Sequence, residues 1–194
     1  MSTCTIRVGL IGYGAIGASL ATLVEQEPCL ELGAVLIRNN PHPPQAAVET
    51  FEDLLAASDI VVEAAGPGAL RAYAPRALEV GKPLLVTSVG ALLTRGCEHL
   101  YTAAREGRLM ATTGAIGGLD LVRAAALADP DLELELLTTK PPRTLVQPWM
   151  DEQQADDLVR MSVDSGPRQV FSGNATEAAE LFPANLNVAA ALAL

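Results

Sequence analysis

A glycine-rich segment near the N-terminus constrains the fold of this chain more than any other feature. Residues 12–17 are Gly-Tyr-Gly-Ala-Ile-Gly, and they directly follow the apolar run of residues 6–11. An amphipathic helical pattern carried by Leu20, Leu23 and Val24 begins immediately afterwards. In such a strand-to-helix turn the first glycine permits the tight bend, the second lets a pyrophosphate approach the backbone, and the third lets the helix pack closely on the strand. The segment therefore predicts a dinucleotide-binding site.

The composition argues against several classes of partner. Hydrophobic residues make up 49% of the 194 residues, but no stretch reaches the about 18 consecutive apolar residues that a membrane span needs. Thirteen basic and 23 acidic residues give a formal net charge of -10, which repels a nucleic-acid backbone and an anionic membrane surface. We therefore expect neither a nucleic acid nor a membrane as a partner.

The sequence also carries no signal for export or for a metal site. Residues 1–5 contain neither the basic segment nor the apolar block of a signal peptide. The three cysteines, Cys4, Cys29 and Cys97, lie far apart, without the spacing of a zinc site or of a disulfide framework. We expect a cytoplasmic protein that holds no metal.

Strands and helices are predicted to alternate through the first part of the chain. After the glycine segment and its helix, the predicted strands cover residues 30–37, 59–66, 83–87 and 109–112, and the predicted helices cover residues 51–57, 69–80 and 95–106. The strands are apolar on both faces, which is typical of a parallel sheet covered by helices on both sides. The expected fold is α/β, a Rossmann-type doubly wound parallel sheet over residues 1–116.

The pattern changes after Gly114. A helix is predicted over residues 119–128, and the strict alternation of leucine with acidic residues over 131–137 predicts a strand with one wet face. A polar helix over residues 151–161, a short strand over 169–172 and a final helix through Ala189 follow. We expect residues 117–194 to form a second, smaller and incomplete α+β domain.

The end of the second predicted strand bears on which dinucleotide is bound. A carboxylate usually stands there and binds the adenosine ribose, but this chain has Ile37-Arg38-Asn39 instead. The guanidinium of Arg38 can pair with a 2′-phosphate, so the cofactor is predicted to be NADP or NAD, with NADP accepted. An ordinary exposed arginine at a strand end is the alternative interpretation.

Small residues follow two later strands at the carboxyl edge of the predicted sheet, where ligands bind in this architecture. They are Ala65 and Gly66 after one strand, and Ser88 after the next. Small side chains there let a nicotinamide ribose lie close to the backbone, although they are equally a plain solution to packing.

Five further segments together resemble one family, the L-aspartate dehydrogenases. They are Val-Val-Glu-Ala-Ala-Gly at 61–66, Thr-Ser-Val-Gly-Ala-Leu at 87–92, Gly-Ala-Ile-Gly-Gly-Leu-Asp at 114–120, Thr-Lys-Pro-Pro at 139–142, and Phe-Pro-Ala-Asn-Leu-Asn-Val-Ala-Ala-Ala at 182–191. The resemblance runs through essentially all of the chain. It implies a nicotinamide-dependent, reversible oxidative deamination of L-aspartate to iminoaspartate, and then to oxaloacetate and ammonia. Iminoaspartate could alternatively feed NAD biosynthesis.

The resemblance also places cofactor contacts on Ala115 and Asn187, although an asparagine can equally serve as a helix cap. With the residues derived above, the predicted cofactor-binding set is Gly12, Gly14, Ala15, Ile16, Gly17, Arg38, Asn39, Ala65, Gly66, Ser88, Ala115 and Asn187. For a substrate carboxylate we expect the amides of a helix start and nearby polar groups. These are Gly117, Gly118, Lys140 and Asn185.

No catalytic residue is assigned within the chain. The resemblance implies that the catalytic histidine of the family lies beyond Leu194, and His42 and His99 match no catalytic motif and are expected to face solvent. The resemblance further implies a homodimer formed through the second sheet. Two alternatives to an active dehydrogenase of L-aspartate remain open: a catalytically incomplete nucleotide-binding protein, and a related dehydrogenase or reductase acting on another substrate of amino-acid metabolism.

Overall fold

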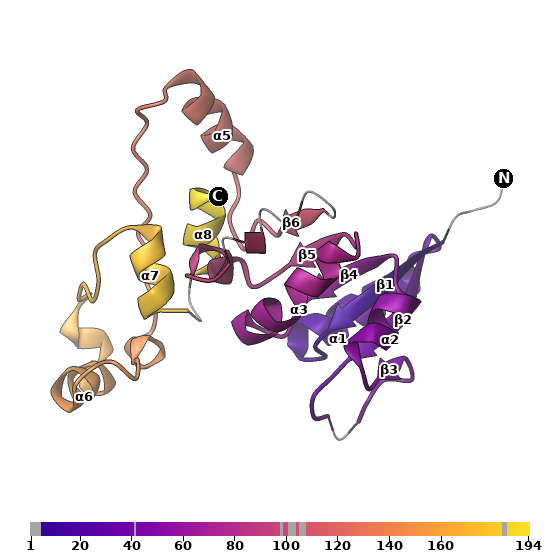
Figure 1. Ribbon diagram of the computed structural model, residues 1–194. Helices are drawn as coiled ribbons and strands as arrows, with labels where there is room; N and C mark the ends of the chain where they lie inside the picture. Colours follow the sequence, from indigo (N-terminus) through magenta and orange to yellow (C-terminus); the bar gives the residue numbers. More distant parts are fainter. Residues whose placement is uncertain (1–4, 41, 98, 101–103, 105–107, 184–185) are drawn as a thin grey trace.

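A six-stranded parallel sheet forms the N-terminal part of the protein. In the computed structural model, residues 5–40, 42–97, 99–100, 104, 108–183 and 186–194 are described. The strands are β1 (Ile6–Ile11), β2 (Leu30–Leu36), β3 (Ala47–Val48), β4 (Ile60–Glu63), β5 (Leu84–Val86) and β6 (Leu109–Ala111) (Figure 1). Their order in the sheet is β3-β2-β1-β4-β5-β6, and every neighbouring pair is parallel. The chain thus changes direction between β1 and β4, the switch point at which such sheets bind dinucleotides.

Helices cover both faces of this sheet, as the alternation predicts. They are α1 (Ala15–Gln26), α2 (Phe51–Ala57) and α3 (Pro67–Glu79). The neighbouring residues Leu10 and Ile11 of β1 point to opposite faces, because side chains alternate along a strand. Leu10 packs in the cluster that contains Val24 of α1, whereas Ile11 packs in the cluster that contains Leu54 of α2 and Leu70 of α3. The predicted doubly wound α/β fold is confirmed.

Two short elements of the N-terminal part were not predicted. β3 has only two residues, which pair with the end of β2, and such a length is too short to show any alternation. The 3-10 helix η1 (Val89–Leu93) follows β5 and buries four of its five residues. Half of the helix predicted over residues 95–106 falls outside the described residues; of the rest, residues 95 and 96 form a turn and residues 99–100 are helical.

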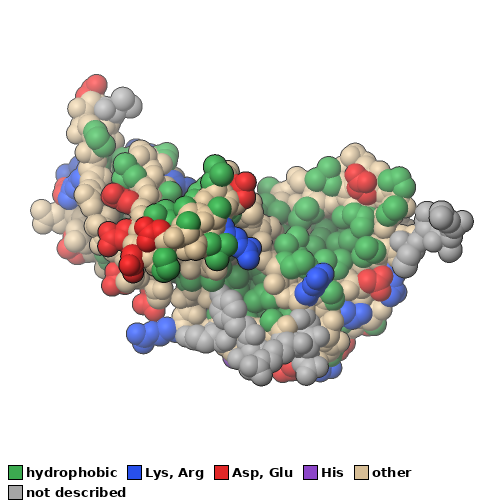
Figure 2. All heavy atoms as spheres, turned by 90° about the horizontal axis from the view of Figure 1, so that it is seen from above, with side chains coloured by type: hydrophobic (Ala, Val, Ile, Leu, Met, Phe, Trp, Pro, Cys, Tyr) green, Lys and Arg blue, Asp and Glu red, His purple; other side chains and the backbone are tan. Residues whose placement is uncertain are grey.

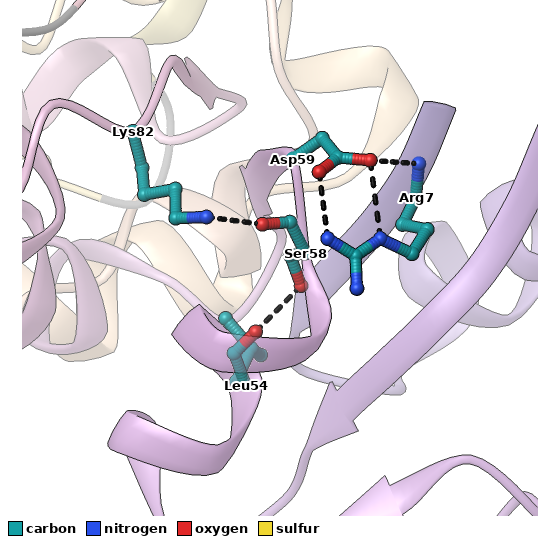
Figure 3. A network of polar contacts seen from close by, with 5 residues as sticks. All are labelled: Arg7, Leu54, Ser58, Asp59 and Lys82. Carbon is teal, nitrogen blue, oxygen red and sulfur yellow. Dashed lines mark hydrogen bonds and ion pairs between the residues drawn. The ribbon is translucent and has the colours of Figure 1, made fainter. Parts of the chain in front are cut away.

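A polar network ties the amino ends of β1 and β4 together, at the edge opposite the switch-point loops (Figure 3). Arg7 donates from its backbone nitrogen to Asp59 at 2.9 Å and from its guanidinium to both carboxylate oxygens, at 2.8 and 3.2 Å. These hydrogen bonds hold the pKa of Asp59 at about 2, below its ordinary value of 3.8. Alongside, Lys82 donates to the carbonyl of Ser58 at 2.5 Å, and the Ser58 hydroxyl donates to Leu54 at 2.6 Å.

The regular secondary structure of the C-terminal part is helical within the described residues. Its elements are α5 (Leu119–Ala128), η2 (Pro142–Leu145), α6 (Glu152–Arg160), η3 (Val163–Ser165), α7 (Ala175–Leu181) and α8 (Asn187–Ala193). The helices predicted over residues 119–128 and 151–161 are confirmed. The final predicted helix, through Ala189, corresponds to α8, and α7 was not predicted. No helix in the described part of the chain has both the length and the apolarity of a membrane span.

The strands predicted over residues 131–137 and 169–172 are wrong for this structure, because neither segment forms a strand. Leu132, Leu134 and Leu136 keep the alternating pattern, but they remain 36–52% exposed in an extended segment. A strand needs a neighbour for its backbone N–H and C=O groups, and within the described residues neither segment pairs with another. The amphipathic pattern is therefore present without the sheet that it would complete.

Candidate functional site

The glycine loop after β1 is tightly packed on one side and open on the other. Gly12 has a φ of +98°, and a Cβ placed on it would lie 2.7 Å from the Cβ of Ala65 in the loop after β4. Its amide donates to the carbonyl of Leu36, at the end of β2, at 2.9 Å. A Cβ on the buried Gly17 would overlap the carbonyl oxygen of Gly12, whereas nothing lies within 4 Å of the position of a Cβ on Gly14. The loop therefore brings strand ends together and leaves space beside its second glycine.

Like α3, α5 and α8, α1 begins without a side-chain cap, whereas three other described helices have one. Thr50, Asp151 and Asn174 each accept a hydrogen bond from a backbone amide at the start of α2, α6 and α7. No described side chain caps α1, whose N-cap is Gly14, and its first turn contains no acidic residue. Uncapped amides at the positive end of a helix bind anions such as a pyrophosphate. The start of α1 and the space at Gly14 fit a dinucleotide.

The loops after β4 and β5 are joined by the buried carboxylate of Glu63, the last residue of β4. Its Oε1 accepts hydrogen bonds from the amides of Ala65 at 2.8 Å and Gly66 at 2.7 Å. The amide of Ser88 donates to Oε2, and the Ser88 hydroxyl donates to Oε1, both at 3.1 Å. The sequence analysis gave Glu63 no role. An acidic residue that ends an otherwise apolar strand is the signal that could have singled it out, since buried carboxylates need several donors.

Asn187, the first residue of α8, connects the C-terminal part to the same edge. Its Oδ1 accepts a hydrogen bond from the amide of Gly90 in η1 at 3.0 Å. A Cβ on Gly114, in the loop after β6, would lie 3.6 Å from the backbone of Asn187. The structure thus brings Asn187, 97 residues distant in sequence from Gly90, to the carboxyl ends of β5 and β6. Ala115 follows Gly114 and is exposed there.

The other predicted cofactor residues lie along this edge with exposed side chains. Arg38 and Asn39 are exposed just after β2, whose end contacts Gly12. Ala15 and Ile16 begin α1 and are also exposed, Ile16 to 54%. An isoleucine exposed beside a glycine loop leaves apolar surface for a ligand to cover.

The predicted substrate residues form a less clearly defined group than the predicted cofactor residues. Gly117 and Gly118 are exposed at the start of α5, where Gly118 is the N-cap and has a φ of +77°. Lys140 is exposed in the extended segment after α5, and no described side chain pairs with it. Asn185 lies outside the described residues.

Neither histidine occupies the glycine-loop edge in a way that marks it as catalytic. His42 is exposed in the loop after β2, where its amide donates to the Oδ1 of Asn40 at 2.9 Å, and His99 is exposed next to the buried Leu100. Among the described residues, no three histidine, cysteine, aspartate or glutamate side chains are grouped to hold a metal ion.

Two cavities lie away from the glycine loop. One of about 140 Å³ lies beside α6 and is lined in part by Trp149 and Arg168. Another, of about 240 Å³, lies beside β2 and includes Leu32 and Pro44. Neither belongs to the candidate cofactor site, which is the edge formed by the carboxyl ends of the strands and the uncapped start of α1.

Comparison with known proteins covers both parts of the chain. Residues 12–111 match the family model described as the NAD binding domain of homoserine dehydrogenase, and residues 120–194 match the model of the C-terminal part of aspartate dehydrogenase. An L-aspartate dehydrogenase of Ralstonia pickettii is 38% identical, over 97% of this chain and 73% of the relative. The chain belongs to the L-aspartate dehydrogenase family. Another member, from Bradyrhizobium diazoefficiens, is 37% identical over 97% of this chain and 69% of the relative.

A solved structure of the same family has a similar fold. The crystal structure of aspartate dehydrogenase from Thermotoga maritima superposes with a TM-score of 0.69 and 25% identity, covering 96% of this chain and 72% of the other. The resemblance inferred from the five sequence blocks is confirmed. The match over residues 12–111 also supports NAD(P) as the cofactor of this family member.

Proposed function

We propose that this chain catalyses the NAD(P)-dependent oxidative deamination of L-aspartate. The observation that carries the proposal is the pair of family matches, an NAD binding domain followed by an aspartate dehydrogenase C-terminal part, on one chain. The second match also supports one substrate over that of a related enzyme. A nucleotide domain like that of homoserine dehydrogenase occurs here with the C-terminal part of aspartate dehydrogenase, which favours L-aspartate as the substrate.

The reaction has two stages. NAD(P)+ held at the start of α1 would supply the acceptor for the hydride that leaves the Cα of L-aspartate. The amino group loses a proton as iminoaspartate forms, water then adds to the imine carbon, and ammonia leaves to give oxaloacetate. A general acid or base contributes about 100- to 10,000-fold to such proton transfers. We assign this role to neither His42 nor His99, and the family's histidine beyond Leu194 stays a prediction. A supply of iminoaspartate to NAD biosynthesis also stays a prediction.

The roles of the site residues follow from their places along the sheet edge. Gly12, Gly14 and Gly17, with the amides of Ala15 and Ile16, would hold the pyrophosphate at the start of α1. Arg38 and Asn39, beyond β2, would lie at the adenosine ribose, where Arg38 can pair with a 2′-phosphate.

On the other side of the switch point, the residues after β4, β5 and β6 would hold the nicotinamide half. These are Ala65, Gly66, Ser88, Ala115 and Asn187. The Oδ1 of Asn187 accepts from Gly90, and we expect its amide NH2 group to donate to the cofactor. Gly117, Gly118, Lys140 and Asn185 are proposed for the substrate carboxylates.

Formation of NADPH and NADH from L-aspartate by the purified chain, measured together with a cofactor titration, tests the proposal. We expect reduction of the cofactor with L-aspartate and none with D-aspartate or L-homoserine. Reduction with L-homoserine alone would place the chain with the related dehydrogenases. Tight cofactor binding without turnover on any of these substrates would support a catalytically incomplete nucleotide-binding protein instead.

The assembly and the domain boundary form a second part of the proposal. We place the boundary between residues 116 and 117, in the connection between β6 and α5, and we propose that the protein works as a cytoplasmic homodimer. Support for the dimer comes from α5, which buries none of its residues and exposes Leu121 to 72% and Leu127 to 79%. Sedimentation velocity over a range of concentrations tests it, and a monomer at every concentration would contradict it.

A further inference from the structure

Glu63 is a buried carboxylate with no cation beside it among the described residues. Its side chain is 0% exposed, and none of the described ion pairs includes it. Its hydrogen bonds come from two loops: the amides of Ala65 and Gly66 after β4, and the amide and hydroxyl of Ser88 after β5. Burying a carboxylate is costly unless its oxygens accept several hydrogen bonds, so a residue that only filled space would be apolar.

The position of these two loops in the sheet indicates which half of the cofactor lies near Glu63. β4 and β5 lie beyond the switch point from β2, in the half of the sheet that faces the nicotinamide end of a dinucleotide. The amides of Ala65 and Gly66, which immediately precede α3, both donate to Glu63 and are not free for a phosphate. Glu63 therefore occupies the two amides that precede α3, whereas no described side chain caps the start of α1, which we assign to the cofactor.

The Ser88 end of the network continues into the C-terminal part. Ser88 is the N-cap of η1, and Gly90 within η1 donates to Asn187 at the start of α8. Hydrogen bonds at Glu63 and Asn187, joined by the backbone of η1, thus connect the loop after β4 to α8.

We propose that Glu63 is a positioning residue, which fixes the loops after β4 and β5 in the arrangement that receives the nicotinamide half of NAD(P). The inference rests on the proposed function, since it requires that this edge binds the dinucleotide. A carboxylate is required because three of the four groups that face it are backbone N–H donors. A glutamine would turn its own NH2 group toward one of them, in the simplest arrangement toward the amide of Ser88.

The test compares Glu63→Gln with the unmodified chain on two ligands. The ligands are NADP+ and 2′-phospho-ADP-ribose, which is the same molecule without the nicotinamide ring. We expect Glu63→Gln to weaken NADP+ binding roughly tenfold, as for a buried donor that loses its acceptor, and to leave 2′-phospho-ADP-ribose binding essentially unchanged. A role in stability alone would weaken both ligands equally or neither, and either result would overturn the proposal.

Two further variants keep the test decisive. Ser88→Ala removes one of the four hydrogen bonds. It should shift the ratio of the affinities for NADP+ and 2′-phospho-ADP-ribose in the same direction, by a smaller factor. If Glu63→Gln does not fold, an unchanged ratio in Ser88→Ala overturns the proposal. Asp59→Asn, at the opposite edge of the sheet, is the control and should leave the ratio unchanged. An unmodified chain that binds neither ligand would overturn the proposed function, and the role of Glu63 with it.

Discussion

The two parts of the molecule share the same kind of amphipathic sequence pattern, but they differ in how far its apolar side chains are buried. Leu84 of β5 is 0% exposed among residues from both α2 and α3, whereas Leu127 of α5 is 79% exposed. Figure 2 shows hydrophobic side chains at the surface of both parts, with acidic side chains gathered on the part that carries the C-terminal helices. In the N-terminal part, the chain itself supplies the partner for every apolar strand. The apolar face of α5 has no such partner among the described residues, so its pattern points to a surface that something else covers.

The largest expected effect is a difference in the free energy of unfolding between variants of these two leucines. Leu84→Ala should lower the free energy of unfolding by about 2–5 kcal/mol, because it leaves a cavity in a core that cannot collapse around it. Leu127→Ala in a dilute sample should change it by less than about 0.5 kcal/mol, as for an exposed position. Urea unfolding of both variants, followed by circular dichroism, measures the difference.

The same pair of variants also tests the proposed dimer. If a second copy covers α5, the cost of Leu127→Ala should grow with protein concentration, since association stabilises the folded state by mass action. A large and concentration-independent cost would contradict the exposed position of Leu127.

Two glycines of the same loop sharpen the comparison within the N-terminal part. Gly17→Ala should destabilise the protein by about 1–3 kcal/mol, because the added methyl group overlaps the backbone of Gly12 in a packed region. Gly14→Ala should leave stability nearly unchanged, because no atom lies within 4 Å of the new Cβ, but it should weaken NADP+ binding by filling the space for the pyrophosphate. Thermal unfolding and cofactor titration of the two variants test this. A Gly14→Ala protein that binds NADP+ normally would place the pyrophosphate elsewhere.

Arg38 is expected to have a smaller and more selective effect. Arg38→Ala should weaken NADP+ roughly tenfold, the lower range for a hydrogen bond to a charged group, and should hardly change NAD+ binding. Arg143→Ala, which removes an exposed cation with no proposed role in binding, is the control for the change in net charge. Equal effects of Arg38→Ala on the affinities for NADP+ and NAD+ would contradict the proposed contact with the 2′-phosphate.

Local pattern was enough to predict the sheet and its glycine loop, because each of these elements depends on residues close in sequence. The strand before Gly12 and the helix after Gly17 set the loop, and the apolar runs of β4 and β5 set their burial on both faces. The order of β2, β1, β4, β5 and β6 then follows from the usual connectivity of such folds, whereas the two-residue β3 was not predicted.

Contacts between distant segments could not be predicted in the same way. Nothing local to Glu63 indicates that Ser88 will donate to it, or that Asn187 will accept from Gly90. The alternation of leucines at 132, 134 and 136 was interpreted as a strand because the pattern specifies a face and not a partner. Where the partner comes from the same local region, as in β1 and β2, the prediction holds.

The smallest expected effect concerns the edge opposite the cofactor and depends on pH. The pKa of Asp59 is about 2 in the folded protein against an ordinary value of 3.8, since Arg7 hydrogen bonds stabilise its charged form. The group therefore contributes stability that is complete above its unfolded pKa and is lost as the pH falls from there through about 2. Asp59→Asn lacks this contribution, so its deficit in stability relative to the unmodified chain should be constant near neutral pH and should narrow over that acid range. Urea titrations across the range measure it, with Glu27→Gln as the control for loss of an exposed carboxylate. A deficit that stays constant down to the acid limit would mean that the Arg7–Asp59 pair does not couple protonation to folding, and that this edge is held by packing alone.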